Sequence, residues 1–410
     1  MAQLALLGGT PVRGKQTAWP QWPIHEEDDV KLISEVTRSN RWSYDGPIEW
    51  KFAEAFAKYL GAKRGICCAN GTVAIQLALE CLDIGAYDEV IVPGMTWQAT
   101  AAACIDVNAV PVLVDIEPDT WCVDIDKAEA AITKKTKAII AVHLYGCMPD
   151  MTRLANLCKK HNLYLIEDCC QAFLTKYQGK ICGTFGDLGC FSFQQSKHMT
   201  TGDGGMIISN NDALGRRMRL SADKGWPREG EFRDHLFLAP AYHMTELQAA
   251  VGIAQLKKLL SIVDARRSSA EKMRPLLACI PGVRPPIEYP WATHTYWKYT
   301  IQVDIGGFSV DMQRIADALK AEGIQSWAGY TKAPIYQYDV LTVPRTFGTS
   351  GWPISGITGK NYTYGPGLCP NAEKVLTEMI VLPWSERYND EHLRDLAAGL
   401  RKVFAHYYRG

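Results

Sequence analysis

The chain has 410 residues, and its 44 lysine and arginine side chains balance 44 aspartate and glutamate side chains. Zero formal net charge lacks the basic excess typical of proteins that bind nucleic acids, and no run of about 20 apolar residues indicates a membrane-spanning helix. The 13 cysteines include no Cys-x-x-Cys pair and the histidines show no metal-ligand spacing, so we expect reduced, buried thiols and no metal site. These features, with an N-terminus unlike a signal peptide, predict a cytoplasmic protein with neither a nucleic-acid nor a membrane partner.

Short apolar runs alternate with segments of helical character in the first half of the chain. The runs are continuous rather than alternating, which is typical of strands covered on both faces in a parallel sheet. Strands separated by helices at this spacing predict an α/β fold with a doubly wound, mainly parallel (mixed) sheet. The expected strands are residues 65–69, 89–93, 110–115, 138–143, 163–168, 189–193 and 205–209, and the expected helices are residues 72–81, 98–107, 125–131 and 151–160.

The second half of the chain predicts a long helix and then a smaller domain. Apolar residues at helical spacing predict a helix over residues 244–260, and we expect it to continue after a bend through residues 263–277. We expect a large domain of residues 1–264, with an N-terminal arm, and a small α+β domain of residues 265–410. The expected elements of the small domain are a proline-rich linker at 281–290, a strand at 296–303, helices at 312–322 and 392–407, and a long surface loop at 340–370.

Lys197 is the first candidate for a chemical role. It follows an expected strand that ends in Phe-Ser-Phe and precedes a Gly-Asp-Gly-Gly turn. A partly buried lysine at the carboxyl edge of a parallel sheet has a lowered pKa, and its neutral amine can attack an aldehyde to form a Schiff base. The alternative is an ordinary surface lysine in a turn, which other strand ends argue against.

Two polar residues lie at the end of the expected strand at 163–168 and shortly after it. Asp168 suits the nitrogen of a pyridine ring such as that of pyridoxal phosphate, because a carboxylate there keeps the ring protonated and electron-withdrawing. Gln171 has the length to hydrogen-bond the oxygen on the same ring, and Trp97, after another strand, could stack on the ring. Each has an alternative interpretation, since Asp168 could cap a helix and Trp97 could be a packing residue.

A candidate phosphate site lies after the first expected strand. Gly71 lets the backbone approach an anion, and the amides of Gly71 and Thr72 at the start of a helix would bind it. Ser192 could add a hydroxyl from a neighbouring strand. The alternative is an ordinary strand–helix turn, but all these segments should converge at the carboxyl edge of the sheet, where ligands bind in such folds.

Taken together, these motifs resemble the DegT/DnrJ/EryC1/StrS sugar aminotransferases, which are pyridoxal 5'-phosphate enzymes of fold type I. The resemblance extends over most of the chain, from residue 7 to residue 384. The motifs that carry it are Asn70-Gly-Thr72, Val142-His-Leu-Tyr-Gly146, Glu167-Asp-Cys-Cys-Gln-Ala172, Gly186-Asp-Leu-Gly-Cys-Phe-Ser-Phe193, Lys197, Gly202-Asp-Gly-Gly205, Met244-Thr-Glu-Leu-Gln-Ala-Ala250 and Ala333-Pro-Ile-Tyr336.

The resemblance implies a role for each candidate residue. Lys197 would hold the cofactor covalently and then move a proton, while Asp168 would contact the ring nitrogen and Gln171 the ring oxygen. Trp97 would stack on the ring. The phosphate contacts would come from Gly71, Thr72 and Ser192. It also implies a homodimer with its active site between the subunits.

Three positions depart from the family pattern. Ala241 stands where the family usually has an asparagine that reaches the phosphate in the neighbouring subunit, so we predict weaker cofactor retention or a substitute donor. His243 replaces a commoner arginine. His198 follows the lysine, whereas a dehydratase branch of the family replaces that lysine with histidine; because Lys197 is retained, transamination is favoured and His198 is expected to be a loop residue.

The implied reaction moves an amino group from glutamate or glutamine to a keto-sugar, nucleotide-linked or free, or to a keto-cyclitol. A sugar dehydratase of the same family and a non-catalytic pyridoxal-phosphate regulator are the alternatives. A nicotinamide-dependent oxidoreductase is disfavoured because no Gly-x-Gly-x-x-Gly follows the first strand. The surface expected for the acceptor comprises the loop at 340–370 and the side chains of Trp42, Tyr44, Trp226, Arg228, Trp297 and Tyr330.

Overall fold

A computed structural model describes residues 3–14, 16–229, 234–355 and 362–410. Its centre is a seven-stranded sheet in the order β1-β9-β8-β5-β4-β2-β3, in which β9 alone runs antiparallel to its neighbours. The predicted doubly wound, mainly parallel α/β fold is therefore confirmed. The strands are β1 (Arg64–Cys68), β2 (Glu89–Pro93), β3 (Val110–Val114), β4 (Thr136–Val142), β5 (Tyr164–Asp168), β8 (Leu188–Ser192) and β9 (Gly205–Ser209).

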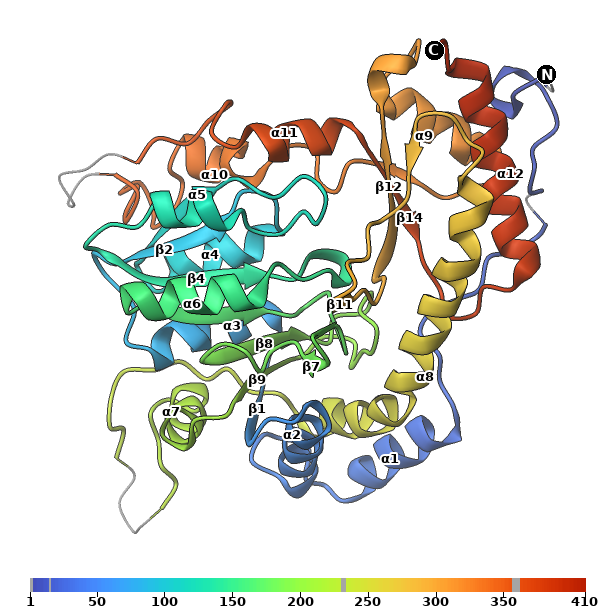
Figure 1. Ribbon diagram of the computed structural model, residues 1–410. Coiled ribbons are helices and arrows are strands. Elements are labelled where there is room, and N and C mark those ends of the chain that lie inside the picture. Colours follow the sequence, from blue (N-terminus) through green and yellow to red (C-terminus); the bar gives the residue numbers. More distant parts are fainter. Residues whose placement is uncertain (1–2, 15, 230–233, 356–361) are drawn as a thin grey trace.

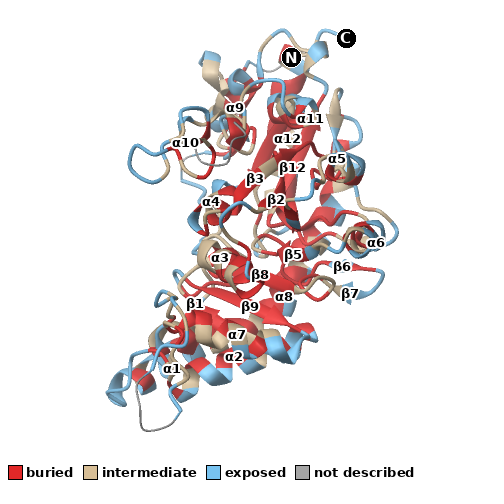
Figure 2. Cartoon of the chain, turned by 90° about the vertical axis from the view of Figure 1, so that its left-hand side faces the viewer, coloured by how far each residue is buried: buried red, intermediate tan, exposed pale blue. Residues whose placement is uncertain are grey.

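Both faces of this sheet are buried, as the continuous apolar runs predict. In β1, Ile66 and Cys68 pack on one face while Cys67 packs on the other, because successive side chains of a strand point to opposite sides. Helices α3, α4 and α7 cover the first face, and α2, α5, α6 and the start of α8 cover the second. Figure 2 shows the buried strands between these layers. The helices are α1 (Glu27–Arg38), α2 (Pro47–Leu60), α3 (Gly71–Cys81), α4 (Gln98–Asp106), α5 (Ile125–Ala130), α6 (Met151–His161), α7 (Asp212–Ala222) and α8 (Glu246–Leu277).

Polar residues fix where two of these helices begin. The side chain of Asn70 accepts a hydrogen bond from the amide of Val73 and so caps α3. Thr245 and Gln248 form a reciprocal capping box at the start of α8. The end of β1 therefore passes into α3 within two residues, which brings the first turn of α3 to the carboxyl edge of the sheet.

A second sheet lies beside the far end of α8 (Figure 1). Its strands run in the order β10-β12-β14-β13, and each pair is antiparallel. One face packs on α9, α12 and the last turns of α8. The elements are β10 (Val283–Arg284), β12 (Lys298–Val303), β13 (Trp327–Ala328), β14 (Met379–Pro383), α9 (Met312–Ala321) and α12 (Asp390–Tyr407).

Short elements complete the described part of the chain. A small three-stranded sheet, in the order β11-β6-β7, pairs Ala292 with Tyr177 across 115 positions of sequence. The remaining elements are β6 (Lys176–Tyr177), β7 (Lys180–Ile181), β11 (Ala292–Thr293), α10 (Asp339–Thr342), α11 (Pro370–Thr377), η1 (Ala5–Leu7), η2 (Leu144–Gly146), η3 (Ile305–Gly307) and η4 (Ile335–Gln337).

The helix α8 connects the two larger sheets without interruption, and Figure 1 shows it curving from one to the other. The two helical segments expected at 244–260 and 263–277 are thus parts of one element. The predicted domain boundary between residues 264 and 265 falls inside this helix, and the division of the chain there stays a prediction.

The segment expected to be a surface loop at 340–370 differs from that prediction. It returns to the large sheet and buries Leu341, Ile354 and Cys369 in the first-face cluster. The prediction was wrong because the many glycines and prolines of the segment indicated a surface loop, whereas these apolar side chains are buried against the large sheet. Residues 356–361 of this segment lie outside the described residues.

All thirteen cysteines are free thiols, and all but Cys170 and Cys279 are buried. None of the helices in the described ranges combines the length and the hydropathy that a bilayer-spanning helix needs.

Candidate active site

A cavity of about 620 Å³ opens at the carboxyl edge of the large sheet. Its lining combines the ends of β5 and β8 and the first turns of α3 and α4 with two aromatic residues from the second half of the chain. All seven residues predicted from the sequence line this one cavity: Gly71, Thr72, Trp97, Asp168, Gln171, Ser192 and Lys197. The expected convergence of the strand ends is therefore what the structure displays.

Lys197 lies in the turn that follows β8, and its side chain faces the cavity. Its Nζ atom is 4.3 Å from the centre of the Trp297 ring, and the Trp297 indole nitrogen donates a hydrogen bond of 2.5 Å to the carbonyl of Ser196. Burial lowers the pKa of Lys197, while the nearby Cys170 and Asp168 oppose that shift. A lysine amine whose pKa is lowered by burial is available as a nucleophile or a base near neutral pH.

Asp168 ends β5 and is held in one orientation by two hydrogen bonds. Thr100 donates from its hydroxyl to one carboxylate oxygen at 3.0 Å, and the backbone amide of Cys170 donates to the other at 3.1 Å. Thr96 contacts the hydroxyl of Thr100 at 2.9 Å, so a short chain of hydroxyls supports the carboxylate. No helix follows β5 in the described residues 169–187, so the alternative interpretation of Asp168 as a helix cap is wrong.

Gln171 is fixed at both ends of its side-chain amide. The oxygen accepts a hydrogen bond of 3.0 Å from the backbone amide of Tyr145, and the nitrogen donates one of 2.8 Å to the hydroxyl of Tyr330. Tyr145 adopts a left-handed backbone with φ of 58°, a conformation that side-chain-bearing residues retain where the surroundings require it. Gln171 is thus held in place before any ligand arrives.

Trp97 forms the open side of the cavity. It precedes the first residue of α4, and 59% of its surface is exposed. The Tyr330 ring lies 6.3 Å from the Trp97 ring at a tilt of 57°. Exposure of a large indole beside a cavity leaves a flat apolar surface free to stack on a ring.

The start of α3 forms a cradle that would accept an anion. The first amides of a helix have no partners within the helix and favour negative charge. A side chain at Gly71 would place its Cβ 2.6 Å from Cβ of Ser192 and 2.9 Å from Sγ of Cys170, so only glycine fits there. The hydroxyls of Thr72 and Ser192 line the same cavity.

These features together fit pyridoxal phosphate. The cradle at Gly71 suits the phosphate, the carboxylate of Asp168 suits the ring nitrogen, and the exposed face of Trp97 suits the ring. Lys197 supplies an amine of lowered pKa in the same cavity. Each end of the cofactor therefore has chemically matched groups in this chain.

Other residues of the lining were missed by sequence reasoning. Thr100 is the clearest, because it lies in the first turn of α4, donates to Asp168, and is contacted by Thr96 from the segment before the helix. Trp297 and Tyr330, expected only as acceptor surface, also line the cavity. The other lining residues without an assigned role are Asn70, Ile75, Ala99, Cys170, Gln194, Ser196 and Asp203.

The remaining acceptor candidates, Trp42, Tyr44, Trp226 and Arg228, lie outside this cavity. Tyr44 stacks on His243 with ring centres 4.0 Å apart, and His243 contacts Asp223 at 2.8 Å. Ala241 pairs with the same Asp223 in an isolated β-bridge.

His198 does not line the cavity either. Its buried ring contacts the carbonyl of Thr295 at 2.9 Å, and burial lowers its pKa well below the usual value.

A buried polar cluster surrounds Glu167, the residue of β5 that precedes Asp168. One oxygen of Glu167 accepts from the amides of Phe185 at 2.7 Å and Gly186 at 2.8 Å, and the other accepts from the amide of Gly183 at 2.8 Å and contacts His143 Nε2 at 2.9 Å. Cys169 brings a thiol into the same cluster. Because protein donors already satisfy the carboxylate, this cluster braces the loop after β5.

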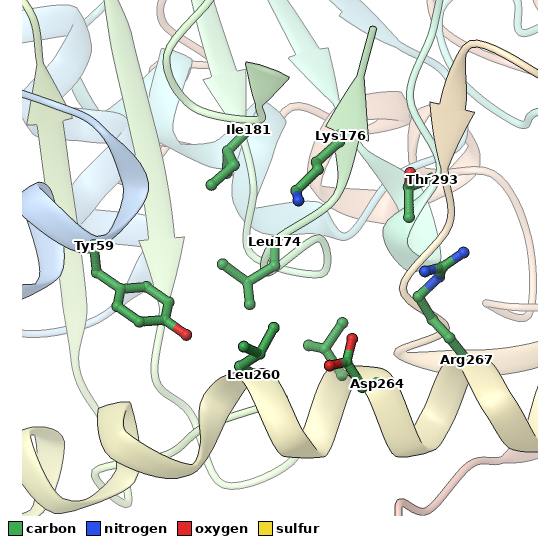
Figure 3. Close-up of a pocket in the computed structure, with 9 residues that line it drawn as sticks. Tyr59, Leu174, Lys176, Ile181, Leu260, Asp264, Arg267 and Thr293 are labelled. Carbon is green, nitrogen blue, oxygen red and sulfur yellow. The ribbon is translucent and has the colours of Figure 1, made fainter. Parts of the chain in front are cut away.

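A smaller cavity of about 170 Å³ contains none of the predicted residues. Figure 3 shows it above α8, with Asp264 and Arg267 on the helix, Tyr59 at one side and Lys176 and Ile181 on the facing strands. Its lining includes neither the start of a helix that could bind an anion nor a lysine near a carboxylate at the end of a strand. The larger cavity is therefore the candidate active site.

Comparisons with known proteins support this site. The profile of the DegT/DnrJ/EryC1/StrS aminotransferase family matches residues 23–401. The chain is 40% identical to an L-glutamine:2-deoxy-scyllo-inosose aminotransferase of Streptomyces kanamyceticus (82% of this chain, 81% of the relative) and 35% identical to a protein of the same name from Micromonospora echinospora (99% of each). The crystal structure of an aminotransferase from Psychrobacter cryohalolentis superimposes with a TM-score of 0.85 at 28% identity, over 95% of this chain and 99% of that one.

The fold matches that of a solved aminotransferase, so the chain has the fold of an aminotransferase, and the family implies pyridoxal phosphate as the cofactor. The chain belongs to the DegT/DnrJ/EryC1/StrS aminotransferase family, and it is an aminotransferase. The family resemblance seen in the sequence is thereby confirmed.

Proposed function

We propose that this enzyme uses pyridoxal phosphate to move the amino group of L-glutamine to a keto-cyclitol of the 2-deoxy-scyllo-inosose type. Both substrates appear in the names of relatives that are 35–40% identical. The observation that carries the proposal is the meeting of Lys197, Asp168, Gln171 and the Gly71 cradle in one cavity of about 620 Å³. That volume lies within the range of about 300–1,000 Å³ that is typical of small-molecule sites.

The residues that would hold the cofactor are those at the strand ends. Gly71, Thr72 and Ser192 would bind its phosphate, and Trp97 would cover the ring. Asp168 would face the ring nitrogen and Gln171 the ring oxygen. When bound, pyridoxal phosphate supplies an electron sink that makes the α-carbon of an amino acid acidic and stores the amino group between the two half-reactions.

Lys197 performs the proton transfers. Its Nζ, whose pKa burial lowers, would take a proton from the α-carbon of glutamine as a general base and return a proton as a general acid. The same atom works in the reverse direction when the keto-cyclitol accepts the amino group. A lowered pKa makes it easier for the amine to give up its proton between the two transfers.

Other properties rest on the family resemblance. We propose a cytoplasmic homodimer with its active site between the subunits, acting in the biosynthesis of aminocyclitol antibiotics. The alternatives of a sugar dehydratase and a non-catalytic regulator are disfavoured because Lys197 is retained and lies beside Asp168 in the same cavity. A nucleotide-linked keto-sugar is a competing acceptor for the experiment below.

The test separates the two half-reactions. Purified enzyme loaded with pyridoxal phosphate is mixed with L-glutamine, and the absorbance change to the amino form of the cofactor is followed. Adding 2-deoxy-scyllo-inosose should then restore the original spectrum and yield an amine detectable by mass spectrometry. L-glutamate and a nucleotide-linked keto-sugar serve as comparison substrates. No spectral change with either amino acid, or loss of water from the acceptor without amination, would contradict the proposal.

A further inference from the structure

A second lysine lies close to Lys197 and has no role in the proton transfers. Lys298 is the first residue of β12 and directly follows Trp297. Its Nζ atom is 5.2 Å from the centre of the Trp297 ring, the same ring that lies 4.3 Å from Nζ of Lys197. The two ammonium groups therefore share one indole as their neighbour.

The register of the small sheet shows which way Lys298 faces. Lys298 is opposite Pro383, and Trp327 is opposite Val381, two positions along the same strand β14. Since directly opposed residues and residues two apart share a face, Lys298, Val381 and Trp327 lie on one side of the sheet. Val381 packs in the cluster of the large sheet, so this side faces the large sheet, and the neighbouring Trp297 lines the cavity although Lys298 itself lies outside the lining.

The opposite face of the small sheet carries its apolar core. Tyr299 and Ile301 alternate with Lys298 along β12, and both pack with α9 and α12. Lys298 instead extends beside Trp327, with Nζ 5.7 Å from that ring, which is 45% exposed. The ammonium group therefore lies near both indoles, on the face of the small sheet that is turned toward the large sheet.

Lys298 has no anionic partner in the parts of the chain that the structure describes. None of the described carboxylates lies within ion-pairing distance of its Nζ atom. Arg266, a nearby cation, is already paired with Glu386 at 3.1 Å. Burial lowers the pKa of Lys298 to about 8, with contributions from Arg266 and Lys197. A partly buried cation without a partner is unfavourable, and an incoming anion would relieve that cost.

The two substrates of the proposed reaction differ in charge. Every amino-acid donor carries a carboxylate on the carbon that bears the amine, whereas a keto-cyclitol is a neutral polyol. Among the described lining residues the lysine is Lys197, whose amine is used in the chemistry, and the acidic side chains are Asp168 and Asp203. The lining itself therefore offers no spare cation for the donor.

We propose that Lys298 binds the α-carboxylate of the amino-acid donor and so selects the donor from the neutral acceptor. This inference rests on the proposed function. A carboxylate bound at Lys298 would hold the α-carbon on the side of the cavity where Lys197 and Lys298 share the Trp297 ring. The contact would be used in the first half-reaction and released before the acceptor binds.

The experiment compares Lys298→Met, which keeps the aliphatic stem, with Lys298→Arg, which keeps the charge. Lys159→Met removes an exposed lysine of α6 and is the matched control. Each enzyme, loaded with cofactor, is studied by rapid mixing in the two half-reactions separately. Calorimetric titration with glutarate, a carboxylate that carries no amine, reports binding without turnover.

We expect Lys298→Met to raise the half-saturating glutamine concentration about tenfold or more, the usual effect of losing a charge-assisted hydrogen bond. The acceptor half-reaction should stay within about twofold, glutarate binding should weaken in parallel, and Lys298→Arg should lie nearer the wild type. Unchanged glutamine saturation in Lys298→Met, or equal loss in both half-reactions, would overturn the assignment. Failure of the wild-type enzyme with any amino acid would instead overturn the proposed function and this inference with it.

Discussion

The cavity has two walls of different character. The wall made by the strand ends holds Asp168 and Gln171 in hydrogen bonds to groups of the same chain. The wall made by the second half of the chain presents Trp297 and Tyr330, with Lys298 beside them carrying a cation that the described residues do not pair. The first wall is arranged before any ligand binds, whereas the second offers groups that a substrate can satisfy.

This difference separates two tasks. Prearranged hydrogen bonds lower the reorganisation needed at the reacting centre, which suits a resident cofactor. Unpaired polar groups discriminate between ligands, because a ligand that leaves them unsatisfied is penalised. Among the contacts that join the walls is the hydrogen bond of 2.8 Å from Gln171 to Tyr330. Substitutions in the first wall should therefore damage chemistry, and substitutions in the second should alter substrate binding.

Among the substitutions that test the difference between the walls, Asp168→Asn is expected to have the largest effect. Replacing the carboxylate by an amide removes the negative charge that would keep the cofactor ring protonated, while the bonds from Thr100 and Cys170 constrain the position. We predict a fall in the rate of the glutamine half-reaction of about 10²-fold or more, the range seen when one electrostatic group of an active site is removed. Rapid-mixing absorbance measurements on loaded enzyme would check it.

Thr100→Val is the control for that prediction. It removes one hydrogen bond to the carboxylate but leaves its charge, so a reduction of only about fivefold is expected. If Asp168→Asn reacts as fast as Thr100→Val, the charge of Asp168 has no special role and the first wall is not the chemical one.

An intermediate effect is expected from pH acting on the second wall. Burial lowers the pKa of Lys298 to about 8, so the side chain is a cation below that pH and becomes a neutral amine as the pH rises through it. The carboxylate of glutamine should therefore bind less tightly above pH 8. The measurement is the half-saturating glutamine concentration from pH 6.5 to about 9.5.

The rise should be absent in Lys298→Met and shifted to higher pH in Lys298→Arg, because a guanidinium stays charged. Lys197 and Arg266 are the other cations that act on Lys298, so the same profile in wild type and Lys298→Met would assign the titration to another group.

The smallest effect is expected where the walls meet. Tyr330→Phe removes the hydroxyl that accepts the bond from Gln171 but keeps the ring that lies 5.2 Å from Tyr145. Losing one neutral hydrogen bond costs about 1 kcal/mol, which corresponds to about a fivefold loss in cofactor affinity. Fluorescence titration of cofactor-free enzyme would measure it.

Tyr59→Phe, at the smaller cavity of Figure 3, is the matched control and should bind cofactor as the wild type does. An equal loss in both variants would show that the change is general and not a property of the junction between the walls.

The sequence predicted the first wall far better than the second. Asp168, Gln171, Ser192 and Lys197 each sit at or just after a strand, and parallel strands deliver their ends to a common edge. Thr100 was missed because its role depends on a contact across 68 positions. The strands β6, β7 and β11 have two residues each, which is too short to show a period-two pattern. The antiparallel direction of β9 was not predicted, because an apolar run does not indicate the direction of its strand.

Trp297 and Tyr330 of the second wall were expected as acceptor surface and line the cavity, whereas Lys298 was not predicted. Its orientation depends on the pairing of β12 with β14 and of β14 with β13, which joins residues 298, 381 and 327. No local motif encodes this arrangement, because the strands meet only after the chain has folded around α8. The buried part of the segment at 340–370 escaped prediction for a similar reason, since its few apolar residues pack on a distant sheet.

The central claim is that Lys197 holds the cofactor covalently through its side-chain nitrogen. The most direct measurement is reduction of the loaded enzyme with borohydride, followed by proteolysis and peptide mass spectrometry. We predict one pyridoxyl-phosphate adduct, on the peptide that contains Lys197, and none on that peptide in Lys197→Ala. A colourless enzyme with no adduct, or an adduct on Lys298 in place of Lys197, would contradict the account.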